Sequence, residues 1–197
     1  MTKLAALFDK PQGTLFLVVG PSGSGKDSIL NFARNHFSKS EEILFPRRYI
    51  SRPMDAGGED HLPITMDDFE KQRQAGQFTF HWRAHGLCYG IPITVEEAIL
   101  AGRSVVVNVS RSILDEARLR FQNVVVLSVI VNEAELRKRL TSRGRETPED
   151  VEKRLARSSA FRVSGNDVQQ IDNSGELETS CKSFIQIVTE NSRLNAT

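Results

Sequence analysis

The sequence of 197 residues is poor in cysteine and tryptophan, with two and one respectively, and has no excess of charge of either sign. Cys88 and Cys181 lie far apart and match no metal-ligand spacing, which favours a reducing cytoplasm over a disulfide scaffold. The 26 basic residues are balanced by 25 acidic ones, which leaves a formal net charge of +1. We therefore expect no general attraction to nucleic acid or to a membrane surface.

Long apolar runs and catalytic histidine patterns are also missing. No stretch approaches the roughly 20 apolar residues of a membrane-spanning helix, and residues 1–12 have too short an apolar stretch for a signal peptide. His61, His81 and His85 have no metal-ligand spacing, and no Ser-His-Asp pattern is present. The length suits one sizeable core. We expect a cytoplasmic protein with a single domain over residues 1–197 and no internal repeat.

An apolar strand that runs directly into a glycine-rich turn is the strongest signal. Leu15–Val19 has the length and branching of a buried strand, and Gly20-x-x-x-x-Gly25-Lys26 follows with the spacing of a Walker A phosphate loop. In such a P-loop, glycines turn backbone N–H groups onto an anion and the lysine reaches the outer phosphates. A helix from about Asp27 adds its positive dipole end. The alternative is a glycine-rich turn of a parallel α/β protein without a ligand.

The loop supplies the candidate residues for nucleotide and metal binding. These are Gly20, Pro21, Ser22, Gly23, Ser24, Gly25, Lys26, Asp27 and Ser28. The position after the lysine, usually a Ser or Thr that binds Mg²⁺, is Asp27. Ser28 resembles the hydroxyl that nucleoside monophosphate kinases often carry one place later, and it is the candidate metal ligand. For Asp27 the sequence leaves open a first-turn carboxylate that favours the helix dipole or a role near the metal.

Strands and helices alternate along the rest of the chain. The apolar, β-branched runs Ser104–Val109 and Val124–Val131 suit central parallel strands, and helices are expected over Ser112–Phe121 and Glu133–Ser142. A strand over Phe78–His85 turns at Gly86. The alternation predicts an α/β fold with a doubly wound parallel sheet of the P-loop NTPase type.

Helix starts are predicted at three threonines. Thr65 with Asp68, and Thr94 with Glu97, have the spacing of capping boxes. Thr147 precedes a proline and two acidic residues, which is typical of the first turn of a helix.

Two groups of arginines are candidates for binding the phosphates of the substrates. The groups are Arg47, Arg48 and Arg52, and later Arg143, Arg145, Arg154 and Arg157. The glycine-interrupted later group is typical of a lid, over about residues 141–158, that closes on nucleotide phosphates. The early group would lie in an acceptor-binding region over about residues 43–92. Solvated surface is the competing interpretation for any single arginine.

Phosphoryl transfer is the reaction that uses this arrangement, because it needs positioning and charge neutralisation more than covalent help. The sequence shows no convincing general base. An acceptor that is itself a phosphate needs none, since its second pKa is about 6 and it is largely an anionic nucleophile at neutral pH.

These motifs resemble the guanylate kinase family along nearly the whole chain. The shared features are the segment 20–26, an Arg-Pro segment at Arg52, the Tyr89-Gly90 turn and the arginine-rich lid. The likeness is closer to the ribose 1,5-bisphosphate phosphokinase branch, associated with phosphonate breakdown. It is carried by segments 20–27, 51–61, 84–92 and 105–111. This resemblance implies transfer of the γ-phosphoryl group of ATP, with Mg²⁺, to the 1-phosphate of ribose 1,5-bisphosphate, which gives 5-phosphoribosyl 1-diphosphate (PRPP) and ADP.

The resemblance also implies roles for residues outside the P-loop. Arg48 and Arg52 would bind acceptor phosphates, and Arg143 and Arg145 would act with Lys26 as catalytic charge stabilisers. The other candidates for acceptor binding, at ribose hydroxyls or the distal phosphate, are Glu59, Asp60, His61, Tyr89, Asn108 and Arg111. Loop caps or local hydrogen bonds are the alternative roles for these residues.

Two other functions compete with this one. The first is a guanylate or nucleoside monophosphate kinase. The glutamate with which guanylate kinases read guanine would align with Phe80, and their later acidic pair would align with Asn108 and Ser110. The loss of these carboxylates weakens that hypothesis. The second is a non-catalytic binding module of the same fold. The presence of Lys26 and the lid arginines argues against this hypothesis. The expected partners are small molecules, and the sequence leaves homo-oligomer formation open.

Overall fold

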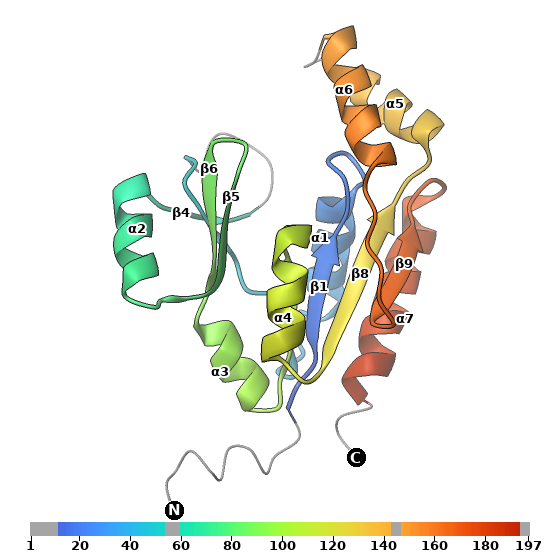
Figure 1. The fold of residues 1–197 in the computed structure, drawn as a ribbon. Coiled ribbons are helices and arrows are strands. Elements are labelled where there is room, and N and C mark those ends of the chain that lie inside the picture. Colours follow the sequence, from blue (N-terminus) through green and yellow to red (C-terminus); the bar gives the residue numbers. More distant parts are fainter. Residues whose placement is uncertain (1–11, 54–59, 143–146, 194–197) are drawn as a thin grey trace, which may run out of the picture.

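A sheet of five parallel strands forms the centre of the computed structural model, which describes residues 12–53, 60–142 and 147–193. The order β2-β7-β1-β8-β9 confirms the predicted parallel sheet. The strands are β1 (Leu15–Val19), β2 (Ile43–Leu44), β7 (Ser104–Asn108), β8 (Val124–Ile130) and β9 (Val168–Asp172). Because all five run the same way, their carboxyl ends meet at one edge of the sheet (Figure 1).

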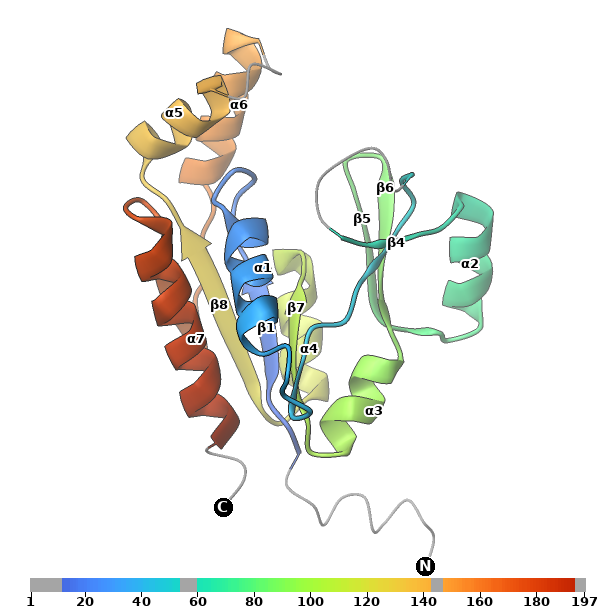
Figure 2. The same ribbon diagram turned by 180° about the vertical axis from the view of Figure 1, so that it is seen from behind.

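Helices cover both faces of this sheet. Residues of β1 alternate between the faces: Phe16 and Val18 pack against α1 and α7, whereas Leu15 and Leu17 pack toward α3 and α4. The helices are α1 (Lys26–His36), α7 (Leu177–Arg193), α3 (Thr94–Leu100) and α4 (Leu114–Arg120). Figure 1 shows α4 in front of the sheet, and Figure 2, from behind, shows α1 and α7. The fold is therefore doubly wound, as the alternation predicts.

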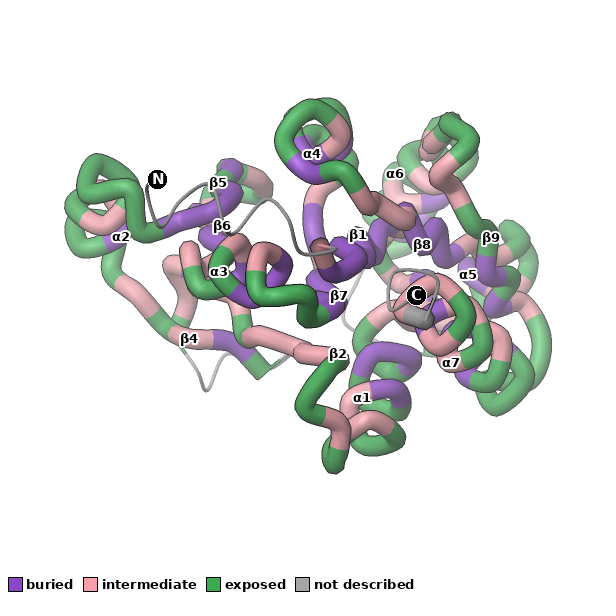
Figure 3. Tube along the Cα trace, turned by 90° about the horizontal axis from the view of Figure 1, so that it is seen from below, coloured by how far each residue is buried: buried purple, intermediate pink, exposed green. Residues whose placement is uncertain are grey.

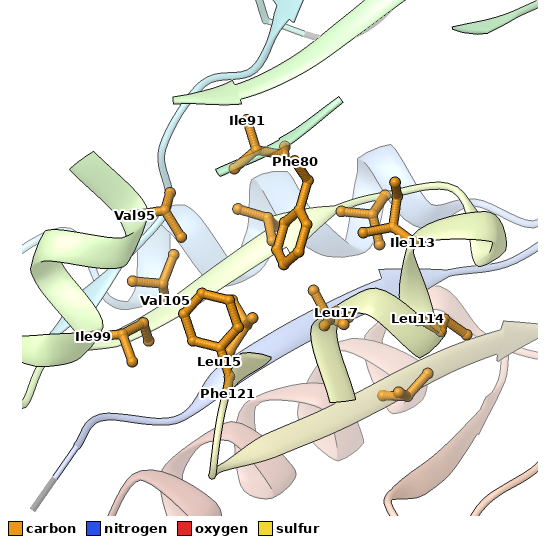
Figure 4. Packing of buried hydrophobic residues seen from close by; sticks show 14 of the residues in the cluster. Leu15, Leu17, Phe80, Ile91, Val95, Ile99, Val105, Ile113, Leu114 and Phe121 are labelled. Atoms are coloured by element: carbon orange, nitrogen blue, oxygen red, sulfur yellow. The ribbon is translucent and has the colours of Figure 1, made fainter. Parts of the chain in front are cut away.

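The buried side chains follow the central strands. Figure 3 shows buried residues concentrated along β1, β7 and β8, with exposed residues on the surrounding helices. In Figure 4, Phe80 and Phe121 meet over β1, their ring centroids 5.7 Å apart. Phe80 belongs to a second sheet, so this contact ties that sheet to the central core.

The second sheet is small and mixed, with the order β4-β3-β6-β5. Its elements are β3 (Tyr49–Ile50), β4 (Leu62–Pro63), β5 (Phe78–Ala84), β6 (Leu87–Pro92) and the covering helix α2 (Met66–Gln74). The predicted hairpin is confirmed, with His85 and Gly86 at its turn, and both have positive φ (52° and 73°). Phe69 of α2 packs on Phe78 of β5.

Helices α5 (Glu133–Ser142) and α6 (Pro148–Ser159) lie together beyond the carboxyl end of β8 (Figure 1). They share a small core of Leu136, Leu140, Val151 and Leu155. Arg137 of α5 donates hydrogen bonds to Glu152 of α6, and these bonds hold the pKa of the Glu152 carboxyl below its ordinary value. Among the described residues, no helix combines the length and apolar character needed to cross a membrane.

The predicted helix starts at Thr65 and Thr147 are confirmed, but the capping box at Thr94 is wrong. The hydroxyls of Thr65 and Thr147 accept from the amides of Asp68 and Asp150 at 3.1 and 3.2 Å. At α3 the N-cap is Ile93, whose carbonyl already accepts from the Glu96 amide at 3.0 Å, and Thr94 is the first helical residue. The helix therefore begins directly after β6 without a side-chain cap. A short 3-10 turn over Arg111–Ile113 also precedes the helix predicted at Ser112.

The core makes a stability prediction. Phe184 of α7 is fully buried against the sheet, whereas Phe32 of α1 is 43% exposed. We expect Phe184→Ala to lower the free energy of unfolding by about 3–5 kcal/mol because it leaves a cavity, and Phe32→Ala to change it by less than about 1 kcal/mol. Urea unfolding followed by circular dichroism measures both. Equal losses in the two variants would contradict the packing described here.

Candidate active site

The glycine-rich turn lies between β1 and α1, as the sequence predicts. Gly25 occupies the N-cap of α1 with φ of 89°, a left-handed conformation that favours glycine. A Cβ atom at Gly25 would lie 2.2 Å from Nδ2 of Asn173, and one at Gly23 would lie 2.8 Å from Cδ1 of Leu136. A side chain at either position would therefore have to displace its neighbour as well as adopt a strained conformation. The expected strand, turn and helix are all present, and the turn opens onto the helix N-terminus, where anions are stabilised.

Lys26 folds back across this turn. Its Nζ atom donates to the carbonyls of Gly20 at 2.7 Å and Pro21 at 2.8 Å. These bonds hold the ammonium over the mouth of the loop, where a bound phosphate would compete with the carbonyls for it. Ser24 is fully buried beneath the loop. All the other residues predicted to bind the nucleotide or the metal line at least one of the surrounding cavities.

Asn173 supports the loop from a strand far away in sequence. It is buried directly after β9, and its Nδ2 donates to the carbonyl of Ser24 at 2.7 Å. The backbone carbonyl of Asn173 accepts a hydrogen bond from Nη2 of Arg139 on α5 at 2.8 Å. This chain of contacts joins α5, the end of β9 and the P-loop. Sequence reasoning missed Asn173, although its place after the last parallel strand puts it at the same sheet edge as the loop.

A cleft of about 370 Å³ separates the loop from the small sheet. One wall carries Lys26, Asp27 and Ser28 from the start of α1. The opposite wall carries residues of the small sheet and its entry, and the end of β7 lies between them. The residues of these two parts are Arg48, Ile50, Arg52, Trp82, Ala84, His85, Tyr89, Asn108, Val109 and Ser110. Four of the predicted acceptor-binding residues, Arg48, Arg52, Tyr89 and Asn108, thus face the P-loop across one cleft.

Arg52 and His61 are held together at this wall. The Nε2 atom of His61 lies 3.1 Å from the carbonyl oxygen of Arg52, and His61 is buried. Within the described residues, Nε of Arg52 is buried without a hydrogen-bond partner. His61 is therefore placed to fix the backbone that carries Arg52, which is the local hydrogen-bond role left open in the sequence analysis.

Another predicted acceptor-binding residue, Asp60, lies outside this cleft. Asp60 is exposed and forms an ion pair with Arg47 at 3.4 Å, beside a small recess that also reaches Arg48. Exposed pairs of this kind contribute little to stability. Glu59, Arg143 and Arg145 lie outside the described residues.

A second cavity of about 410 Å³ adjoins the loop on the side of α6. It is lined by Arg111, whose guanidinium lies 5.1 Å from the ring centroid of Phe161, and by Arg154 and Arg157 of α6. Nη1 of Arg154 donates to the Ser22 hydroxyl at 3.2 Å. Arg111 is thus grouped with the α6 arginines rather than with Arg48 and Arg52.

The start of α1 suits a magnesium ion bound mainly through a nucleotide. Ser28 and Asp27 offer a hydroxyl and a carboxylate to the cleft beside Lys26, and oxygen is the ligand that Mg²⁺ prefers. No cluster of three or more His, Cys, Asp or Glu side chains able to hold a metal occurs in the described part of the chain. Mg²⁺ commonly takes one or two protein oxygens together with substrate phosphates and water, and these two residues fit that pattern.

A P-loop at the end of a central parallel strand, facing arginines across a cleft, defines the class of P-loop kinases. The model of the guanylate kinase family matches residues 12–191, and the chain belongs to this family.

Within the family, the most informative similarities are to ribose 1,5-bisphosphate phosphokinases. The chain is 43% identical over 177 residues to ribose 1,5-bisphosphate phosphokinase PhnN of Rhizobium etli, with 90% of each chain covered. It is 41% identical over 182 residues to the protein of the same name from Brucella melitensis, with 92% and 95% covered. The crystal structure of guanylate kinase from Anaplasma phagocytophilum has a TM-score of 0.64 at 17% identity, covering 93% of this chain and 88% of that one. This structural likeness supports the fold.

The Asn173 contact makes the first prediction about the site. We expect Asn173→Ala to raise the KM for ATP about tenfold or more, because the buried Ser24 carbonyl loses its donor and the loop loses its support. The KM for the phosphoryl acceptor should stay nearly unchanged. Steady-state kinetics with each substrate varied in turn measures both. Asn35→Ala, on the exposed face of α1, is the matched control, and an unchanged KM for ATP in Asn173→Ala would contradict the proposed support.

Proposed function

We propose that this protein transfers the γ-phosphoryl group of ATP to the 1-phosphate of ribose 1,5-bisphosphate and releases PRPP and ADP. The observation that carries the proposal is that one cleft is lined by Lys26 of the P-loop and by Arg48 and Arg52, which lie on either side of β3. The names of relatives about 40% identical over about 90% of the chain support the acceptor.

The donor side would be built from the P-loop. Backbone amides between Gly20 and Gly25 would donate to the β- and γ-phosphates, and Lys26 would exchange its two carbonyl partners for phosphate oxygens. Ser28, with Asp27 beside it, would hold Mg²⁺, which supplies neutralisation of the charge on the transferred group. These contacts act through fixed position and charge, which is the main source of catalysis in phosphoryl transfer.

The acceptor side needs cations but no base. Arg48 and Arg52 place positive charge on the wall opposite the P-loop, where it would offset repulsion between the two phosphate-bearing substrates. A phosphate monoester is already largely a dianion at neutral pH, because its second pKa is about 6. His61 is buried against the Arg52 carbonyl, which is a positioning role rather than proton transfer.

Helices α5 and α6 would act as a lid. Arg154 already contacts Ser22 of the P-loop, and Arg157 lines the adjoining cavity. In this proposal Arg143 and Arg145, from the segment between the two helices, stabilise the charge of the transferred group on closure. Closure would also exclude water, which suppresses hydrolysis of ATP.

Guanylate kinase activity is the second candidate, because the family model that matches the chain is named for it. The residue aligned with the guanine-reading glutamate, Phe80, is 1% exposed and packs on Phe121 in the core. Phenylalanine can accept no hydrogen bond from a base. At the cleft, Asn108 and Ser110 take the places of the acidic pair. A guanine bound there would leave its donors without the carboxylates that read them, so the sugar phosphate is favoured.

An acceptor comparison tests the proposal. The protein is mixed with Mg-ATP and either ribose 1,5-bisphosphate or GMP, ADP release is followed, and the product is identified by phosphorus NMR. We expect turnover with ribose 1,5-bisphosphate and a new diphosphate signal, and little or none with GMP. Turnover only with GMP would identify a guanylate kinase, and no turnover with either would favour a non-catalytic module.

Lys26→Ala tests the donor side. The substitution removes a contact that strengthens in the transition state, so kcat should fall by about 10²–10³-fold or more. The partly buried position at the helix start should tolerate it, and the unfolding midpoint should change little. A folded Lys26→Ala variant with the turnover of the unmodified protein would contradict the assigned role.

A further inference from the structure

A stacked aromatic pair forms part of the cleft wall opposite the P-loop. Trp82 of β5 and Tyr89 of β6 are directly paired across the two strands. Their rings are parallel to within 2°, with centroids 5.2 Å apart. Trp82, the only tryptophan of the chain, is 9% exposed, so it is fixed by packing while still lining the cleft. Nothing in the sequence motifs or in the proposed chemistry uses Trp82.

This aromatic pair holds one particular arginine. The Cζ atom of Arg48 lies 5.0 Å from the ring centroid of Tyr89 and 5.6 Å from that of Trp82. On another side, Nη1 of Arg48 donates to the carbonyl of Asn108 at the end of β7, at 3.1 Å. Two rings from the small sheet and one carbonyl from the large sheet thus fix the plane of the guanidinium. Arg52, the other arginine of this wall, has no such aromatic contact among those described.

A fixed guanidinium is suited to recognise a phosphate. It presents a planar fork of donors that matches phosphate oxygens, and pre-organisation reduces the entropy lost on binding. An acceptor with two phosphates needs two anion-binding places, one beside Lys26 for the phosphate that reacts and one for the phosphate that does not. Lys26 belongs to the loop that would hold the transferred group, whereas Arg48 is fixed on the other wall of the cleft by the two rings and by the Asn108 carbonyl. Arg48 therefore suits the second place.

We infer that Arg48 binds the non-reacting phosphate of the acceptor, and that Trp82 is the residue that positions Arg48 for this contact through its stack with Tyr89. The inference rests on the proposed function, because it takes a sugar bisphosphate as the acceptor. It makes Trp82 a specificity-determining residue, since a sugar with only the reacting phosphate would not use this contact.

Binding measurements with two acceptors test the inference. Calorimetry gives the dissociation constants of ribose 1,5-bisphosphate and ribose 1-phosphate for the unmodified protein and for Arg48→Ala, Trp82→Ala, Trp82→Phe and the double variant Arg48→Ala with Trp82→Ala. Arg47→Ala is the matched control, because Arg47 is the neighbouring arginine and pairs with Asp60 at the surface. Binding is the readout, so the result stands apart from the transfer assay that tests the proposed function.

The unmodified protein should bind the bisphosphate more tightly, and Arg48→Ala should cut this preference by about 10- to 100-fold while changing ribose 1-phosphate binding little. Trp82→Ala should cut it in the same direction, and Trp82→Phe should keep most of it. The double variant should be no worse than Arg48→Ala alone, because Trp82 acts through Arg48. Arg47→Ala should keep the preference.

Three results would overturn the inference. The first is equal binding of the two acceptors by the unmodified protein. The second is an Arg48→Ala variant that weakens both acceptors by the same factor, which would place Arg48 at the reacting phosphate. The third is a folded Trp82→Ala variant that keeps the full preference, or whose loss adds fully to that of Arg48→Ala in the double variant, since either would show that Trp82 does not act through Arg48.

Discussion

The tight glycine turn between β1 and α1 is the constraint on which the rest of the structure depends. A phosphate can be held by N–H groups only where the chain turns tightly, and a turn of this kind needs glycine at the positions where side chains would meet Asn173 and Leu136. The turn must also be followed at once by a helix, so that the helix dipole adds to the same place. The parallel sheet satisfies both needs because its central strand is buried on both faces and ends in the middle of one edge.

The same edge gathers groups that are distant in sequence. Asn108 ends β7 and Asn173 follows β9, so parallel strands bring both beside the P-loop without any local sequence signal. The small sheet then supplies the opposite wall, which the loop itself could not provide. Although the net charge of the whole chain is only +1, arginines on either side of β3, in the 3-10 turn after β7 and in α6 gather around one cleft and its adjoining cavity. Local placement, rather than overall charge, makes this surface attractive to anionic substrates.

The parts of the fold that the sequence could predict are those set by local patterns. The glycine spacing, the apolar strands and the caps at Thr65 and Thr147 each depend on neighbours within a few residues. The small sheet was harder to predict, because β3 and β4 are only two residues long and their pairing joins segments that are not adjacent in the sequence. Asn173 contacts Ser24 across 149 positions, and Trp82 is identified only by what it stacks on. Such contacts depend on the tertiary structure and cannot be predicted from the local sequence pattern. Thr94 is not a cap because α3 follows β6 almost directly and Ile93 occupies the N-cap position.

The central claim is that one cleft holds the donor and acceptor phosphates together. Binding of a bisubstrate analogue tests this most directly, using adenosine joined through a polyphosphate chain to C1 of ribose 5-phosphate. If both halves occupy the cleft, linking them should make the analogue bind at least about 100-fold more tightly than ATP in a competition measurement. An analogue in which guanosine replaces the ribose 5-phosphate should gain much less. Binding of the ribose analogue no tighter than that of ATP would contradict the account.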